Sequence, residues 1–170
     1  MIDPVLLVPA DPSWPAAFAA EAERLRAAAA DLPVAVEHVG STAVPRLVAK
    51  PVVDILVGVP SLADADALVP RLQALGYEYV PAFEKQIPDR RYLRTRKTHV
   101  HVVRKGGALW YEYLAFRDWL RAHPEDARRY AVLKQQLATR YRHDRDSYTA
   151  GKAPFVAEIL RRAGAVAAPR

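Results

Sequence analysis

The sequence predicts an α+β fold, in which a mixed β-sheet has helices packed against it. Segments rich in β-branched residues lie before residue 105, whereas the later segments have the spacing of amphipathic helices. The 170 residues contain no internal repeat, and this length suits one compact domain with its own core. We therefore expect a single domain at 1–170, with a sheet-containing core at 1–105 and C-terminal helices at 106–165.

Two helices are predicted in the first half of the chain from the residues at their ends. Asp11 followed by Pro12 is typical of a helix start, and the alanine-rich segment up to Ala30 predicts the helix itself. Ser61 predicts the cap of a second helix, and Gly76 is the natural residue just beyond its end.

The strands are predicted from short runs of β-branched and aromatic residues between turn signals. These runs lie at 5–8, 34–39, 52–59, 77–80, 90–95 and 98–103, with a loop at 81–89. Because the run at 52–59 is apolar at nearly every position, it predicts a strand buried on both faces in the middle of the sheet.

The remainder of the chain is predicted to be helical. One helix face has the 4-3-4 spacing of Leu109, Tyr113, Phe116 and Leu120. Pro124 restarts a helix after His123, because proline suits the first helical turn. A final helix begins at about Ala153.

The stretch at 37–59 holds the strongest candidates for chemistry. Asp54 interrupts the apolar strand, and an ionised carboxylate away from water needs a partner charge, hydrogen bonds or a metal. Upstream, Gly40, Ser41 and Thr42 form a loop whose N–H groups and hydroxyls could hold an anion. Lys50 could balance the acid or reach a phosphate, or it could be a solvated lysine at the strand entrance. A phosphate on the loop and a cation on the acid is the simplest chemistry that uses both.

Two histidines are candidates for the same site. His99 and His101 share one face of a predicted strand, because side chains alternate along a strand. If this strand neighbours the one that carries Asp54, both imidazoles reach the carboxylate. With Asp54, and with His38 as an optional further ligand, they would then form a site for a transition metal such as Zn²⁺. The alternative is that the imidazoles hydrogen-bond neighbouring polar groups or lie on a solvated face.

Basic residues alternate along another predicted strand. One face of this strand would carry Arg90, Tyr92, Arg94 and Arg96. Arginine forks on one face could clamp a phosphate. The alternative, which we favour slightly, is an exposed edge strand that its charges protect from aggregation.

The segment HVGSTAVPRLVAKPVVDILV at 38–57 resembles the signature of the GrpB family, whose members are related to the nucleotidyltransferase superfamily. The resemblance extends to the opening with Asp11, Pro12 and Trp14 and to the His-x-His strand. It also covers a C-terminal pattern, formed by Tyr130, Lys134, Tyr148, Lys152 and Phe155. It thus covers most of the chain and implies a nucleotidyltransferase-like mixed β-sheet with flanking helices and a C-terminal helical portion.

The superfamily pattern is a Gly-Ser turn followed by a strand with two acids, two residues apart. Gly40, Ser41 and Asp54 match it, whereas Leu56 stands in the place of the second acid. Two-metal phosphoryl transfer uses clustered carboxylates. The missing acid would have to come from elsewhere, and Glu84 and Glu112 are the candidates.

The resemblance implies transfer of a nucleotidyl group from a nucleoside triphosphate with Mg²⁺. Gly40 and Ser41 would lie on the phosphates, Asp54 on the metal, and Lys134 and Lys152 would reach over the site to bind phosphate.

Two other functions remain open. The same fold could be a non-catalytic module that binds a nucleotide or coenzyme, since GrpB-like domains also occur fused to dephospho-coenzyme A kinase. A metalloenzyme could instead use Asp54, His99 and His101 as ligands and catalytic groups.

The composition restricts the partners and the compartment. The formal net charge of +6 and the pI near 9.7 favour an anionic partner, although a composition rich in arginine and alanine would also give them. No recognised motif supports nucleic acid as that partner. The absence of cysteine excludes disulfides, thiolate zinc sites and cysteine nucleophiles. No apolar run resembles a signal peptide or reaches the length of a membrane span, so we expect a cytoplasmic protein.

Overall fold

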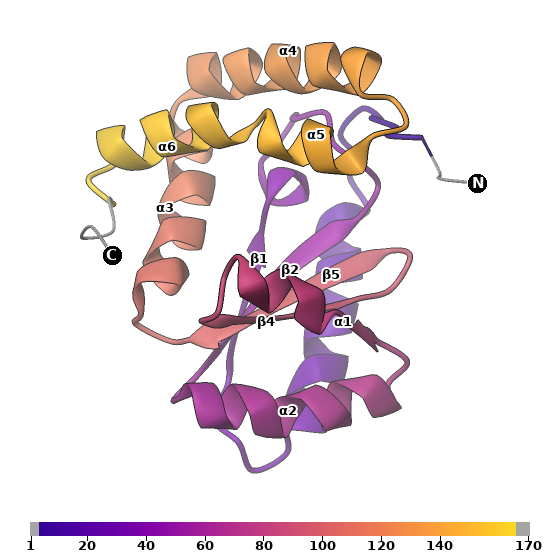
Figure 1. Cartoon of the computed structure of the whole chain (residues 1–170), viewed down its shortest axis with the longest axis vertical. Helices are drawn as coiled ribbons and strands as arrows, with labels where there is room; N and C mark the ends of the chain where they lie inside the picture. Colours follow the sequence, from indigo (N-terminus) through magenta and orange to yellow (C-terminus); the bar gives the residue numbers. More distant parts are fainter. Residues whose placement is uncertain (1–3, 166–170) are drawn as a thin grey trace.

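The computed structural model describes residues 4–165, and it has the predicted α+β architecture of a mixed sheet with flanking helices (Figure 1). The strands are β1 (Ala35–Val39), β2 (Val53–Val59), β3 (Glu78–Tyr79), β4 (Arg90–Arg94) and β5 (Thr98–Arg104). Their order in the sheet is β1-β2-β5-β4-β3. Strands β2 and β5 run parallel and the other neighbours antiparallel, so the apolar strand β2 lies inside the sheet, as its sequence predicts.

Helices cover both faces of this sheet. The helices are α1 (Trp14–Ala29), α2 (Leu62–Ala74), α3 (Ala108–Ala122), α4 (Pro124–Arg140), α5 (Arg145–Ala150) and α6 (Ala153–Arg162). The first two pack on one face and α3 packs on the other. The last three form a separate layer at the top of Figure 1, which we call the C-terminal helical layer. Within residues 4–165, no helix is both long enough and apolar enough to cross a bilayer.

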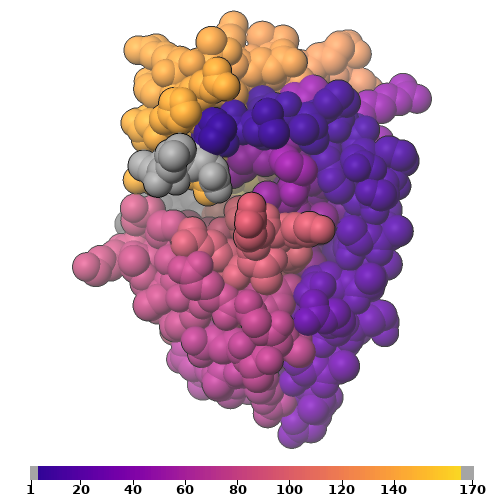
Figure 2. Space-filling view, turned by 90° about the vertical axis from the view of Figure 1, so that its right-hand side faces the viewer, coloured from indigo at the N-terminus to yellow at the C-terminus, as the bar shows by residue number. Residues whose placement is uncertain are grey.

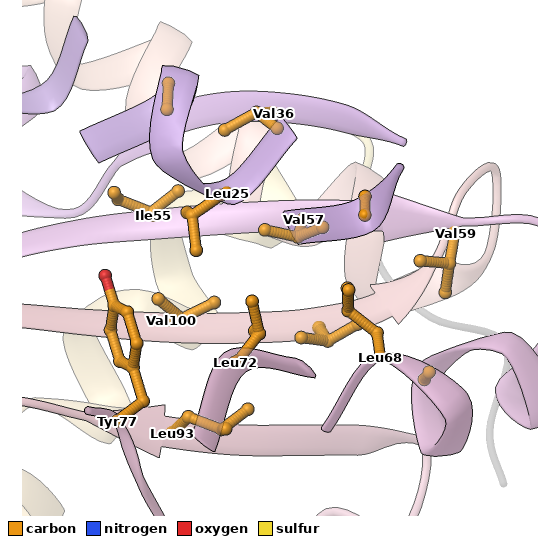
Figure 3. Close-up of a cluster of buried hydrophobic side chains, with 14 of the residues drawn as sticks. Leu25, Val36, Ile55, Val57, Val59, Leu68, Leu72, Tyr77, Leu93 and Val100 are labelled. Carbon is orange, nitrogen blue, oxygen red and sulfur yellow. The ribbon is translucent and has the colours of Figure 1, made fainter. Parts of the chain in front are cut away.

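The main core lies between the sheet and the first two helices (Figure 3). Leu25 of α1 and Leu72 of α2 point toward Val57 and Val100 on the two central strands, and all four are almost fully buried. Helix α2 begins as predicted, because the Ser61 side chain accepts a hydrogen bond from a backbone N–H of its first turn. This core uses one face of the sheet, and the other face carries both a smaller apolar cluster beneath α3 and polar side chains.

The pairing of β2 with β5 decides which side chains meet. In this parallel ladder Asp54 lies opposite His99, and Leu56 lies opposite His101. Because side chains alternate, these four residues share the face that is turned away from the main core. The predicted neighbourhood of Asp54 and the two histidines is therefore confirmed.

The N-terminal segment differs from the prediction. The expected strand at 5–8 forms only an isolated bridge between Val8 and Ala49, and Pro9 has no N–H with which to extend the ladder. The first helix begins at Trp14, because the Asp11 carboxylate accepts a hydrogen bond from the Ser13 backbone and forms a turn instead of a cap.

Two further expectations are wrong. Strand β4 is not an exposed edge, since β3 pairs with its other side. The loop expected at 81–89 contains the 3₁₀ helix η2 (Pro81–Lys85). In addition, the short helix α5 was not distinguished in the sequence, although Asp144 caps it through the Ser147 backbone N–H at 2.9 Å.

Candidate functional site

A pocket of about 670 Å³ lies between the sheet and the C-terminal helical layer. Figure 2 shows a hollow between this layer, in orange, and the pink segments below it. The pocket is lined by basic side chains from both sides, namely Lys50, Arg90, Arg94, Lys134, Arg145 and Lys152. Two carboxylates, Asp54 and Asp146, line it as well. The pocket is therefore strongly cationic.

Asp54 stands at the centre of a carboxylate–imidazole cluster. Its Oδ1 atom lies 3.2 Å from Nε2 of His101 and 3.4 Å from Nδ1 of His99. Its side chain is 28% exposed, toward the pocket. Burial acts to raise the pKa of the Asp54 carboxyl, but hydrogen bonds from His101 and His99 outweigh this effect and hold the pKa well below its usual range. Asp54 is therefore an anion at every physiological pH.

A chain of hydrogen bonds fixes the His101 ring. The Arg90 guanidinium donates to the Tyr113 hydroxyl at 3.0 Å, and that hydroxyl lies 3.1 Å from Nδ1 of His101. Burial lowers the pKa of His101, which favours the neutral ring. A neutral ring that donates from Nε2 to Asp54 must accept at Nδ1, so Tyr113 donates to it. Both ring nitrogens are thus engaged within the protein.

The loop before β2 brings the backbone against the Asp54 carboxylate. Gly40 has φ +70°, and a Cβ atom there would lie 2.6 Å from Oδ2 of Asp54. The residues that follow form the 3₁₀ helix η1 (Ser41–Ala43). Glycine is required at this position both by its left-handed conformation and by the space that Asp54 occupies.

We expect Gly40→Ala to lower the free energy of unfolding by about 2–4 kcal/mol, since it combines a strained φ with a clash. Urea denaturation measures the loss. Gly76→Ala is the matched control, because Gly76 has φ +94° but open space around its Cβ position, and it should lose only about 1 kcal/mol. Equal losses at the two sites would contradict the close approach to Asp54.

The loop hydroxyls are engaged within the protein. Ser41 Oγ accepts a hydrogen bond from the Lys134 ammonium at 2.8 Å, and Thr42 Oγ1 lies 2.9 Å from Nε2 of His38. His38 itself stacks on Phe18 of α1, with the ring centroids 4.8 Å apart. Burial lowers the pKa of His38 to about 4. Since His38 faces α1, the structure does not bring it to the Asp54 cluster.

Three lysines reach the pocket from separate parts of the chain. Lys50 precedes β2, Lys134 comes from α4, and Lys152 stands at the start of α6. Lys134 also donates a hydrogen bond to the Val48 carbonyl. Burial, together with the charge of Lys152, lowers the pKa of Lys134 to about 7. Burial, together with the charge of Lys50, lowers the pKa of Lys152 to about 8. The predicted approach of Lys134 and Lys152 to the site is present.

The predicted arginine face is only partly at the site. Arg90, Tyr92 and Arg94 line the pocket, whereas Arg96 lies in the exposed turn after β4. Arg94 is paired with Glu78 at 2.8 Å. Among the described residues 4–165, the buried Nε atom of Arg90 finds no hydrogen-bond partner. An unpartnered buried donor is costly, so Arg90 is suited to meet a ligand.

The position of the second acid of the nucleotidyltransferase pattern is occupied by Leu56, which is not an acid. Leu56 is fully buried and packs in an apolar cluster with Val39, Val103 and Trp110. Glu84, one proposed replacement, accepts a hydrogen bond from Tyr79 and does not line the pocket. In the part of the chain at 4–165, no group of three or more His, Cys, Asp or Glu side chains is placed to hold a metal ion.

Some residues of the site were not found from the sequence. Arg145, Asp146 and Thr149 on α5 line the pocket, and Tyr113 on α3 contacts His101 from outside the pocket lining. The signal for α5 was present in Asp144, whose position three residues before Ser147 is typical of a helix cap. The hydrogen bond of Tyr113 to His101 had no local signal, because it depends on how α3 packs against the sheet.

Comparison with known proteins identifies similar chains over nearly the full length. The family model described as GrpB protein matches residues 4–162. A UPF0157 protein of Pseudomonas aeruginosa is 48% identical over 169 residues, which cover 95% of this chain and 68% of the relative. The crystal structure of a conserved GrpB protein from Enterococcus faecalis has a TM-score of 0.83 and 36% identity, covering 93% of this chain and 96% of that one.

A similar chain also occurs within a larger protein. A protein of Mycolicibacterium paratuberculosis named dephospho-CoA kinase is 36% identical over 187 residues. The match covers 94% of this chain but only 46% of that protein, so more than half of the relative lies outside it.

Proposed function

This chain belongs to the GrpB family, and on that premise we propose that its pocket binds a phosphorylated small molecule of the nucleotide or coenzyme type. The observation that carries the proposal is the convergence of basic side chains from β4, the C-terminal helical layer and the approach to β2 on one pocket. Charge-assisted hydrogen bonds from lysine and arginine are the usual means of holding phosphate.

The electrostatics of the pocket support an anionic ligand. The pKa values of Lys134 and Lys152 are lowered first by burial and then by neighbouring lysines, so their positive charges are held at a cost. A phosphate would relieve this cost by supplying the missing negative charge. The kinase name of the mycobacterial relative supports a nucleotide or coenzyme A derivative, although that name describes a protein more than twice as long as the matched part.

Nucleotidyl transfer is the second candidate, and one observation favours it. The ionised Asp54 carboxylate faces the same pocket as the lysines, where it could approach a reacting phosphate. The test is release of pyrophosphate from nucleoside triphosphates with and without Mg²⁺. Turnover that Asp54→Asn abolishes would establish transfer. Binding without turnover under all these conditions would leave the pocket as a binding module.

The binding proposal is tested by calorimetry with paired ligands at pH 7. ATP and coenzyme A should bind, whereas adenosine and pantetheine, which lack the phosphates, should not. Lys50→Met should weaken binding about tenfold or more, because it removes a charged donor. Lys97→Met is the matched control, since Lys97 lies in the exposed turn between β4 and β5, outside the pocket, and it should have no effect.

Equal binding of ATP and adenosine would contradict a phosphate-binding pocket. An equal effect of the Lys50 and Lys97 substitutions would also contradict it, since the attraction would then come from net charge alone.

A further inference from the structure

We infer that the ligand carries a chain of two or three phosphates, and that the lysine side chains hold this chain without Mg²⁺. The inference rests on the proposed function and concerns which phosphate compound the pocket selects. Its subsite, which we call the lysine wall, consists of Lys50, Lys134 and Lys152 with Arg145 beside them.

The lysine wall has more positive charge than one phosphate can neutralise. The charges of its members lower one another's pKa values: Lys50 and Lys152 act on Lys134, and Arg145 acts on Lys50. Asp54 is the acid whose charge acts on all three lysines. A phosphate monoester carries about −1.5 to −2 charges at pH 7, and each further phosphoryl group adds about one more. Within residues 4–165, the six cations that line the pocket face Asp54, Asp146 and the Glu78 partner of Arg94. The excess of about three positive charges matches a di- or triphosphate.

Two of the cations lie over the same aromatic ring, where both can act on one chain of phosphates. The Lys152 ammonium lies 4.7 Å from the centroid of the Tyr148 ring, and the Lys50 ammonium lies 5.9 Å from the same centroid. Lys134 lies 4.8 Å from the Tyr130 ring centroid. The aromatic faces partly offset the charge of buried ammonium groups in the absence of an anion. They thus keep the lysines in place for one.

The loop of Gly40, Ser41 and Thr42 is less suited to this task than its sequence suggests. Ser41 Oγ already accepts from Lys134, and Thr42 Oγ1 is paired with His38. The hydroxyls therefore position protein groups, and Lys134 is tied to the loop as a rigid donor. The phosphate chain is met chiefly by side chains of the C-terminal helical layer.

The residues around Asp54 do not fit the ligand set that Mg²⁺ prefers. Mg²⁺ takes oxygen ligands in octahedral geometry, usually from one or two carboxylates and the phosphates. Here Oδ1 of Asp54 faces two imidazoles, and buried Leu56 occupies the place of a second carboxylate. Asp146 lines the pocket from α5, but no group of three acidic or imidazole ligands is formed within residues 4–165. Ammonium groups stand where a metal clamp would otherwise neutralise the phosphates.

Calorimetry with inorganic phosphate, pyrophosphate and tripolyphosphate tests the inference, once in EDTA and once in excess MgCl₂. In EDTA, the two longer anions should bind about tenfold or more tightly than phosphate. Mg²⁺ should weaken their binding, because it competes with the lysines for the same oxygens. Lys152→Met should weaken tripolyphosphate about tenfold and inorganic phosphate much less, while Lys97→Met should change neither. Lys152 makes no side-chain hydrogen bond within residues 4–165, so this variant should fold normally.

Different results would contradict the metal-free subsite, the selection of a phosphate chain and the proposed function. Binding of pyrophosphate and tripolyphosphate only in MgCl₂ would overturn the metal-free subsite, and equal affinity for all three anions would overturn the selection of a phosphate chain. If none of the three bound and ATP and coenzyme A also failed to bind, the proposed function itself would be wrong.

Discussion

Replacing Leu56 by aspartate is expected to lower the free energy of unfolding by about 3–5 kcal/mol, and not to create a metal site. Leu56 is fully buried among Val39, Val103 and Trp110, so the new carboxylate would lose its hydration. The neighbouring His101 could not compensate, because Asp54 and Tyr113 already engage both of its ring nitrogens. Urea denaturation, with and without Mg²⁺, measures the effect. The variant would restore the acid of the nucleotidyltransferase pattern in sequence but place it in the wrong environment.

Leu56→Met is the control, because it keeps an apolar side chain of similar volume and should cost less than about 1.5 kcal/mol. A Leu56→Asp protein that is as stable as the original, or that Mg²⁺ stabilises strongly, would show that the position tolerates a metal ligand. The surroundings of Leu56 would then be polar enough to accept a charged side chain.

Replacing Lys134 by methionine should have opposite effects on ligand binding and on stability. Binding of tripolyphosphate should weaken by about 30- to 100-fold, since the change removes the most buried cation of the lysine wall. The free energy of unfolding at pH 6 should rise by about 1–2 kcal/mol, because a buried charge without its anion is replaced by an apolar side chain. The lost hydrogen bonds to Ser41 and Val48 limit this gain.

The stability difference should depend on pH with a defined sign. The pKa of Lys134 is lowered from its ordinary value to about 7 in the folded protein, first by burial and then by Lys152. Above pH 7 the unfolded chain therefore binds the proton that the folded protein has lost, and the original protein gains stability as the pH rises toward about 10. Lys50, Lys152 and Asp54 face the same group and shift this window.

The advantage of Lys134→Met should thus shrink between pH 7 and 10, as measured by urea denaturation at several pH values. Lys97→Met should show no such trend, because its side chain lies in an exposed turn. A stability difference that does not change with pH would mean that Lys134 is not held as a costly charge. Lys134, the most buried member of the lysine wall, would then not need a phosphate to offset its charge.

Much of the fold could be predicted because its signals are local. The apolar run of β2, the cap at Ser61 and the restart at Pro124 each reflect the chemistry of a few neighbouring residues. The failures occurred where tertiary context decided the outcome. The run at 5–8 has strand composition but too few partners, and strand β4 is covered by β3, which consists of only two residues.

The site was predictable only in part for the same reason. The meeting of Asp54, His99 and His101 follows from strand alternation and one correct neighbour relation. The roles of individual groups do not follow, since they depend on contacts between distant segments. Asp54, for example, makes Nε2 of His101 the donor, so that Tyr113 donates to Nδ1, and Lys134 occupies a loop hydroxyl that the sequence alone leaves free for a ligand.

The hydrogen bond between Lys134 and Ser41 joins residues 93 positions apart in the sequence, so the two sides of the pocket are synthesised at different times. The five strands found in residues 4–165 all lie within 35–104, so a chain that emerges from the ribosome with its N-terminus first has the residues of this sheet available before α4 has been synthesised. The walls of the pocket are therefore completed late. A chain ending near residue 123 would retain Asp54 and both histidines but lack Lys134 and Lys152, so it would lack the side of the pocket that the C-terminal helical layer supplies.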